Sequence, residues 1–153
     1  YDSGGAVGYW AKTETGGAVG NQASSKQGGA VGFAAHSGSG FAGGFFAFTG
    51  TKNANGEITS YGNGGAVGLN ASTNRGGAVG WSAKSGYGGA VGYEAFVGVK
   101  SDDGTIDTSE GKGGAVGSSA SSKCGGAVGY VATSTDGGAV GWGAEAGTGF
   151  AGG

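Results

Sequence analysis

A five-residue motif, Gly-Gly-Ala-Val-Gly, recurs at intervals of 12 residues, and this spacing constrains the possible folds more than any other feature of the chain. A variant, Gly-Phe-Ala-Gly-Gly, takes the place of the motif at Gly40 and Gly149. A unit this short cannot bury an apolar face alone, so consecutive units must stack on one another. Counting both forms, the repeat units begin at residues 4, 16, 28, 40, 64, 76, 88, 113, 125, 137 and 149.

The sequence of the unit indicates β-strands. A Gly-Gly pair in nearly every unit interrupts any helix, whereas Ala-Val followed by aromatic and Ser/Thr residues favours strands. Glycine accounts for 43 of the 153 residues, which leaves too little side-chain volume for a bulky core. We therefore predict an all-β fold, a parallel β-solenoid (a β-roll or β-helix) with 12-residue coils, in a single repeat domain over residues 1–153. Neighbouring coils should pair through their backbones at about 4.8 Å per rung.

Two of the steps between units are longer, from residue 40 to 64 and from 88 to 113. Each extra segment places β-forming residues around a dipeptide that suits a tight turn, Asn55-Gly56 or Asp103-Gly104. We predict two β-hairpin insertions that protrude from the solenoid, at about 48–62 and 96–111. The motif pattern restarts at residue 113 as at residue 4, so we expect the chain to be a segment of a longer repetitive protein.

Numbering each coil from 1 at the first glycine of the motif, position 4 is valine except at Gly43 and Gly152. In those two coils position 2 changes from glycine to phenylalanine. Positions 2 and 4 lie on the same side of a strand, and this exchange of volume predicts that both face the interior. The predicted core ladder comprises Val7, Val19, Val31, Phe41, Val67, Val79, Val91, Val116, Val128, Val140 and Phe150.

Position 8 is always alanine, which indicates a site with no room for a larger side chain. The alanine at position 3 and the glycine at position 5 should allow close approach of another chain, or of another wall of the same chain. Burial of so little apolar area barely offsets the entropy of ordering a coil, so we expect oligomerisation. The predicted tight alanine ladder comprises Ala11, Ala23, Ala35, Ala47, Ala71, Ala83, Ala95, Ala120, Ala132 and Ala144.

Position 6 is mostly aromatic, with interruptions at Asn21, Leu69 and Ser118. One interpretation is stacking of rings from rung to rung at an edge, and the other is an exposed stripe that contacts sugars or a surface. Positions 7, 9, 11 and 12 vary freely and are assigned to the solvated surface. The possible aromatic contact ladder comprises Tyr9, Phe33, Phe45, Trp81, Tyr93, Tyr130 and Trp142.

The remaining residue types give no sign of catalysis. His36 is the only histidine, so neither a catalytic triad nor a cluster of histidine ligands can be assembled. We expect no catalytic residue, no metal site, no cofactor and no enzymatic activity. The net charge of −2 and the absence of a basic run argue against nucleic acid, and no apolar stretch is long enough for direct membrane insertion.

A few polar residues remain as minor candidates. Asp102, Asp103 and Asp107 are interpreted as turn residues, with weak Ca²⁺ binding as the alternative. Cys124 has no partner for an intrachain disulfide and is either a free thiol or an interchain bridge. Asn70 begins a glycosylation sequon, which matters only in a eukaryotic secretory setting.

Units such as Gly28-Gly-Ala-Val-Gly-Phe-Ala-Ala35 resemble the head repeats of YadA-type trimeric autotransporter adhesins, and related phage tail-fibre repeats. The resemblance extends over nearly all coils and implies a left-handed parallel β-roll, three chains side by side, and adhesion to host matrix or cells. Those repeats typically have 14 residues, whereas the period here is 12, and no stalk or membrane anchor is recognisable.

The sequence thus favours an extracellular or cell-surface β-solenoid with a structural or adhesive role, which self-associates into a homotrimer or filament. A glycan or host-surface ligand is a further expected partner. Two other functions remain open. One is an ice-binding solenoid, although position 10 mixes Ser, Thr, Val and Ala rather than repeating Thr. The other is a carbohydrate-binding module that uses the aromatic ladder.

Overall fold

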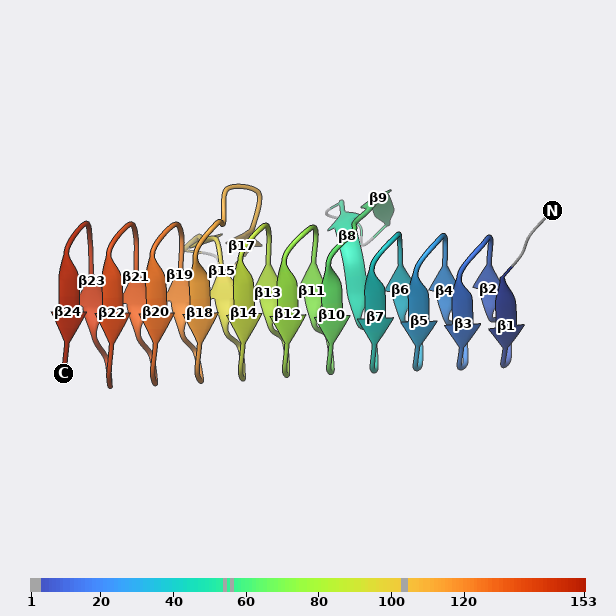
Figure 1. Cartoon of the computed structure of the whole chain (residues 1–153), viewed down its shortest axis with the longest axis horizontal. Coiled ribbons are helices and arrows are strands. Elements are labelled where there is room, and N and C mark those ends of the chain that lie inside the picture. Colours follow the sequence, from blue (N-terminus) through green and yellow to red (C-terminus); the bar gives the residue numbers. More distant parts are fainter. Residues whose placement is uncertain (1–3, 54, 56, 103–104) are drawn as a thin grey trace. The chain divides into compact units, whose positions relative to one another are not determined.

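The computed structural model describes residues 4–53, 55, 57–102 and 105–153. All regular elements among these residues are β-strands, most of them two or three residues long (Figure 1). The chain forms two compact units, Tyr1–Arg75 and Gly76–Gly153, which are built in the same way. In each unit a coil contributes one strand from positions 2–4 and a second from positions 9–10, except that the last coil of the chain contributes only the first of these.

In the first unit these strands form two parallel sheets, in which equivalent positions of successive coils lie side by side. Ala6, for example, pairs with Ala18, and Ser24 pairs with His36. The first sheet contains β1 (Gly5–Val7), β3 (Gly17–Val19), β5 (Gly29–Val31), β7 (Phe41–Gly43) and β10 (Gly65–Val67). The second contains β2 (Lys12–Thr13), β4 (Ser24–Ser25), β6 (His36–Ser37), β8 (Phe48–Lys52) and β11 (Ser72–Thr73).

The second unit repeats this arrangement, again with parallel pairing in the register of the motif, as between Ala115 and Ala127. Its first sheet contains β12 (Gly77–Val79), β14 (Gly89–Val91), β18 (Gly114–Val116), β20 (Gly126–Val128), β22 (Gly138–Val140) and β24 (Phe150–Gly152). Its second contains β13 (Lys84–Ser85), β15 (Phe96–Val97), β19 (Ser121–Ser122), β21 (Thr133–Ser134) and β23 (Glu145–Ala146). The predicted parallel β-solenoid with 12-residue coils is confirmed.

Both insertions form the predicted antiparallel hairpins. In the first, β8 continues beyond its coil and pairs with β9 (Ile58–Tyr61). In the second, β16 (Val99–Lys100) pairs with β17 (Ile106–Asp107). The turn dipeptides predicted from the sequence involve Gly56, Asp103 and Gly104, which lie outside the described residues.

The space between the two sheets of a unit is filled by very small side chains. Alanine at position 3 comes from the first sheet, as at Ala127 and Ala139, and packs with alanine at position 8, as at Ala132 and Ala144. From Ala23 to Ala132 the position-8 alanines are fully buried, and Ala144 is nearly so, which agrees with the prediction of a confined site; Ala11 is half-buried. Because the interior is so narrow, most of the cohesion comes from backbone hydrogen bonds between coils.

The predicted core ladder is wrong. Position 3 faces inward, so positions 2 and 4 face outward, and Val7, Val19, Val31, Val67, Val79, Val91, Val116, Val128 and Val140 are all exposed, as are Phe41 and Phe150. Since alanine already fills the gap between the sheets, valine would not fit there. Of the two partners considered for the alanine at position 3, another chain or another wall of the same chain, the structure shows the second. This alanine packs against the opposite sheet of its own chain.

Two of the glycines in each coil are required by the stacking. At position 5 the backbone has a φ near +130°, as at Gly129 (φ 139°). Residues other than glycine rarely adopt this conformation. A Cβ on Gly129 would also overlap the carbonyl oxygen of Gly141 in the next coil. At position 1 a Cβ on Gly125 would overlap the carbonyl oxygen of Gly137 in the same way.

Position 10 supplies the polar part of the interior. Ser134, for example, is almost completely buried and donates a hydrogen bond of 2.6 Å to the carbonyl oxygen of Gly137. Equivalent bonds join Ser37 to Gly40 and Ser122 to Gly125. These hydroxyls hold the turn that leads into the next coil.

Candidate functional site

The outer surface of the first sheet is the most regular feature of each unit. We call it the Gly/Val face, defined as the outward-facing positions 2 and 4 of β1, β3, β5, β7 and β10 in the first unit, and of β12, β14, β18, β20, β22 and β24 in the second. From Val19 to Val140 its valines are 43–47% exposed. No polar or charged side chain occurs at these positions. Each unit therefore presents an apolar surface to its surroundings.

Position 9, on the outer surface of the second sheet, varies from coil to coil in size and charge, although Ser, Lys and Phe each recur and Phe48 is buried. Its residues include Lys12, His36, Phe48, Thr133 and Glu145. A surface in contact with water alone tolerates such variety. The uniformity of the Gly/Val face therefore indicates a constraint that is absent from the opposite side of the same coils.

No contact within the coil requires the glycine at position 2. A Cβ added at Gly114 or Gly126 would meet nothing within 4 Å, and neither residue has a φ in the left-handed region. The methyl group of alanine could be accommodated, and glycine costs about 0.5–1 kcal/mol relative to alanine within a strand. The same openness is found at Gly5, Gly17, Gly65, Gly77 and Gly89. Seven of the eleven coils thus keep a glycine that the packing of the chain does not require, whereas a Cβ at Gly29 or Gly138 would lie 3.0 or 3.1 Å from the ring of Phe41 or Phe150.

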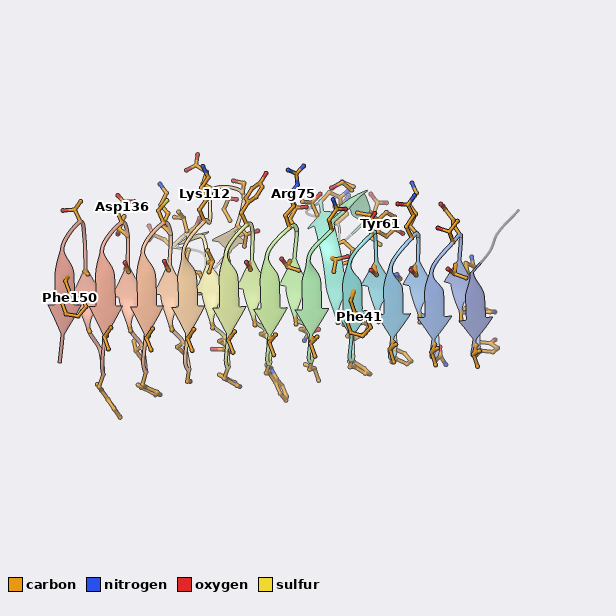
Figure 2. All side chains as sticks on the ribbon, in the orientation of Figure 1. Phe41, Tyr61, Arg75, Lys112, Asp136 and Phe150 are labelled. Carbon is orange, nitrogen blue, oxygen red and sulfur yellow. The ribbon has the colours of Figure 1, made fainter. Side chains whose placement is uncertain are left out.

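The two phenylalanines on this face keep its surface filled. Phe41 and Phe150 project from the first sheet in Figure 2, and each is followed two residues later by glycine in place of valine. A Cβ on Gly43 would lie 2.7 Å from the ring of Phe41, and one on Gly152 would lie 3.2 Å from the ring of Phe150. The ring thus occupies the space that valine fills in other coils.

A second feature is the aromatic edge, formed by the position-6 rings at the turns between the two strands of a coil. In the first unit it includes Tyr9, Phe33 and Phe45, and in the second Trp81, Tyr93, Tyr130 and Trp142, all exposed. Phe33 and Phe45 stack with centroids 4.9 Å apart and planes 12° apart. The rings of Tyr130 and Trp142 lie 4.6 Å apart.

This stacking bears on the two interpretations of the aromatic column. A sugar stacks on the face of a ring, but the faces of Phe33 and Phe45 are turned toward one another, and the rings of Tyr130 and Trp142 are in contact at a tilt of 34°. The geometry therefore favours stacking from rung to rung. In the ice-binding alternative, the mixed column at position 10 is unavailable as a contact surface, because Ser37, Ser85 and Ser122 are buried.

The polar edge lies at the opposite turns, where Arg75, Lys112 and Asp136 project in Figure 2. A groove of about 970 Å³ lies in the first unit, between the second sheet and Ile58 and Tyr61 of the first hairpin. His36 lines it and is half-buried, and its Nδ1 is hydrogen-bonded to the hydroxyl of Ser24 at 2.5 Å. The sequence predicted a solvated side chain for His36, whereas the structure shows it half-buried.

The other polar candidates are separate from one another. The carboxylate of Asp107 accepts a hydrogen bond of 2.9 Å from the backbone N–H of Ser109, which lowers the pKa of Asp107. This is the geometry of a turn residue. Cys124 is a free, exposed thiol. Asn70 is exposed and takes a left-handed φ of 55°.

Within the described part of the chain, no three His, Cys, Asp or Glu side chains are grouped so that they could hold a metal ion. Nor do the described residues include a helix with the length and apolar character needed to cross a membrane. Comparison with protein-family models, with curated proteins and with solved structures finds no match for the chain.

Proposed function

We propose that the protein is a non-catalytic, extracellular or cell-surface β-solenoid with a structural or adhesive role, and that it acts by self-association through the Gly/Val face. The observation that carries the proposal is the glycine at position 2, which the coil itself does not need. A small residue repeated at an open position is useful when another surface must come close to the backbone. The resemblance to adhesin heads implies a homotrimer, and the small apolar area of each coil leads us to expect oligomers or a filament; an association face of this kind would serve such self-association.

The energetics agree with weak, additive association. Full burial of a valine side chain contributes about 1.5–3 kcal/mol, so covering the exposed half of each contributes about 1 kcal/mol. The second unit alone has five such half-exposed valines, each able to contribute this free energy: Val79, Val91, Val116, Val128 and Val140. The gain must exceed the loss of rotational and translational freedom on association, which is about 4–15 kcal/mol. Association should therefore depend strongly on the number of coils.

The experiment is sedimentation velocity over a range of protein concentrations. The wild-type chain should shift to larger species as the concentration rises. The double variant Val116→Lys/Val128→Lys should remain monomeric, because it places charges on the Gly/Val face. The control Thr133→Lys/Glu145→Lys, on the opposite and exposed positions, should associate like the wild type. A wild-type chain that stays monomeric at the highest concentration would refute the proposal.

Ice binding is the second candidate, because the Gly/Val face repeats one apolar side chain at the spacing of the rungs, about 4.8 Å. A thermal-hysteresis assay on the same set of variants separates the two functions. Hysteresis that is lost in Val116→Lys/Val128→Lys, together with a monomeric wild type, would assign the face to ice.

A further inference from the structure

The Gly/Val face has a relief of two parallel lines. The valines at position 4 form a ridge along the solenoid axis, and the glycines at position 2 form a furrow beside it. Two residues along a strand separate ridge and furrow by about 6.6 Å. The alanine between them points inward and adds nothing to the relief. In the second unit both lines run without interruption through β12, β14, β18, β20 and β22.

This relief discriminates between the ways in which two copies can meet face to face. A two-fold axis parallel to the strands leaves each line opposite its own kind, so valine meets valine and glycine faces glycine across a void. A two-fold axis parallel to the solenoid axis exchanges the two lines, so each ridge lies opposite a furrow. Only the second arrangement fills the interface on both sides.

We propose that a second copy of the chain docks on the Gly/Val face about a two-fold axis parallel to the solenoid axis, with the valine ridge of each copy in the glycine furrow of the other. This inference rests on the proposed self-association and specifies its geometry as a pair of copies, in place of a homotrimer through this face. The two solenoid axes then run in the same direction, while the strands that face each other are antiparallel. The glycines at position 2 are explained, because any larger side chain would fill the furrow.

The charge of the face is compatible with a second copy. A charge enclosed in such an interface loses its hydration and is costly unless an opposite charge pairs with it. Positions 2, 3 and 4 carry no charged residue in any coil. The variable charges lie on the other side of the coil, as at Lys84 and Glu145. Two copies can therefore meet through this face without enclosing an unpaired charge.

The area available sets the expected affinity. The five strands of the uninterrupted run, about 4.8 Å apart and about 10 Å long, give roughly 240 Å² per copy in the second unit, compared with about 800 Å² per partner in a standard stable interface. One unit alone should thus dimerise weakly, and additional coils should strengthen the complex steeply. Phe41 and Phe150 lie in the furrow and mark where an uninterrupted run ends.

Disulfide trapping tests the geometry. In a Cys124→Ser background, two single variants are prepared, Gly114→Cys and Val116→Cys, both on β18 at the middle of the run. A cysteine fits at Gly114, because a Cβ there meets nothing within 4 Å. The two proteins, made distinguishable by mass, are mixed at equal concentration and oxidised with copper phenanthroline. Thr133→Cys, on the opposite exposed face, is the control.

The expected product is the mixed dimer, at least tenfold in excess over either homodimer. In the proposed geometry the introduced cysteines of the two variants face each other. Pairs at the same position are offset sideways by about 6.6 Å in addition to the gap between the sheets, beyond the ~7 Å that a disulfide can span. A repeat with Gly126→Cys and Val128→Cys on β20 should give the same preference.

Two other outcomes overturn the inference in different ways. A dominant Val116→Cys homodimer would show ridge against ridge, so the geometry would be wrong while self-association stood. No cross-linking above the Thr133→Cys control, together with a monomeric wild-type chain in sedimentation, would remove both the geometry and the proposed function.

Discussion

The ring of Phe41 lies across the backbone at Gly43, two residues further along β7, on the outside of the solenoid. The ring takes the place of the valine side chain that other coils carry at this position. The exposed fraction of Phe41, 44%, is close to that of the valines. The pair therefore preserves the filled surface of the Gly/Val face, which a coil exposed only to water would have no reason to preserve.

Two glycines of one coil should respond oppositely to the same substitution. Gly129→Ala should lower the free energy of unfolding by at least about 3 kcal/mol, because its positive φ and the overlap with Gly141 act together. Gly126→Ala should raise it by about 0.5–1 kcal/mol, since the site is open and the unfolded chain loses entropy. Urea unfolding of both variants measures the difference. Similar losses in the two would contradict the distinction between positions 5 and 2.

Gly126→Ala also separates stability from assembly. The methyl group enters the furrow, so the variant should associate more weakly than the wild type even though its monomer is more stable. Sedimentation velocity and thermal melting on the same sample measure the two effects. If the variant is more stable but associates as strongly as the wild type, the glycine furrow is not part of the interface.

The turn at position 7 stores strain in most coils. Val131 has a left-handed φ of 54°, which costs a branched L-residue about 1–2 kcal/mol. Val131→Asn should therefore raise the free energy of unfolding by about 0.5–1.5 kcal/mol, because asparagine tolerates this conformation better. Gly143, at the equivalent site in the next coil (φ 60°), is the matched control, and Gly143→Val should lower stability by a similar amount. Thermal denaturation of both variants tests the pair.

The buried hydroxyls should contribute measurably to the turns. Ser134→Ala removes the hydrogen bond to the carbonyl oxygen of Gly137 and should lower the free energy of unfolding by about 1–2 kcal/mol. Thr135→Ala, one residue later and exposed, should change it by less than about 0.5 kcal/mol. Equal effects in chemical denaturation would mean that the hydroxyl of Ser134 is not specifically important.

Stacking at the aromatic edge can be measured with a double-mutant cycle. Tyr130→Leu and Trp142→Leu, separately and together, should give a coupling energy of about 0.5–1.5 kcal/mol, as expected for stacked rings. A coupling near zero would show that the rings are independent of each other. A glycan that binds the wild type and not the double variant would restore the carbohydrate hypothesis.

Salt should discriminate the Gly/Val face from any charged interface. Because the face is uncharged, self-association should be nearly unchanged between low and high sodium chloride. Ammonium sulfate should strengthen it, since excluded salts favour apolar burial. Sedimentation equilibrium in the two salts measures both responses. A steep loss of association in sodium chloride would point to the polar edge instead.

Much of the fold follows from the spacing of the glycines. The 12-residue period requires stacked coils, and the Asn-Gly and Asp-Gly insertions indicate hairpins, both of which the structure contains. The pairing of positions 2 and 4 on one side of the strand was also readable from Phe41 and Gly43. The choice of the inward side was wrong, because the exchange of volume between positions 2 and 4 was interpreted as a sign of burial, although an exposed surface shows the same exchange.

A signal for the inward side was nevertheless present. In the two variant coils positions 2 and 4 change, while Ala42 and Ala151 at position 3 do not. An interior that admits only a methyl group is the less tolerant side, so the invariant alanine marked it. The left-handed turn at position 7 had only a weak signal, Asn70 and Gly143, because residues such as Trp10, Phe46 and Val131 occupy it in most other coils.

The direction of the hydrogen bonds between coils has a mechanical consequence. These bonds, such as Lys12 N–H to the carbonyl of Ala23 at 2.9 Å, run along the solenoid axis from one coil to the next. Tension along that axis therefore loads the rungs in series, and they separate one coil at a time. Each detached coil of 12 residues releases about 35 Å of extended chain. A stretched solenoid would lengthen stepwise at moderate force and absorb mechanical work, and a copy docked along its side would resist the first step.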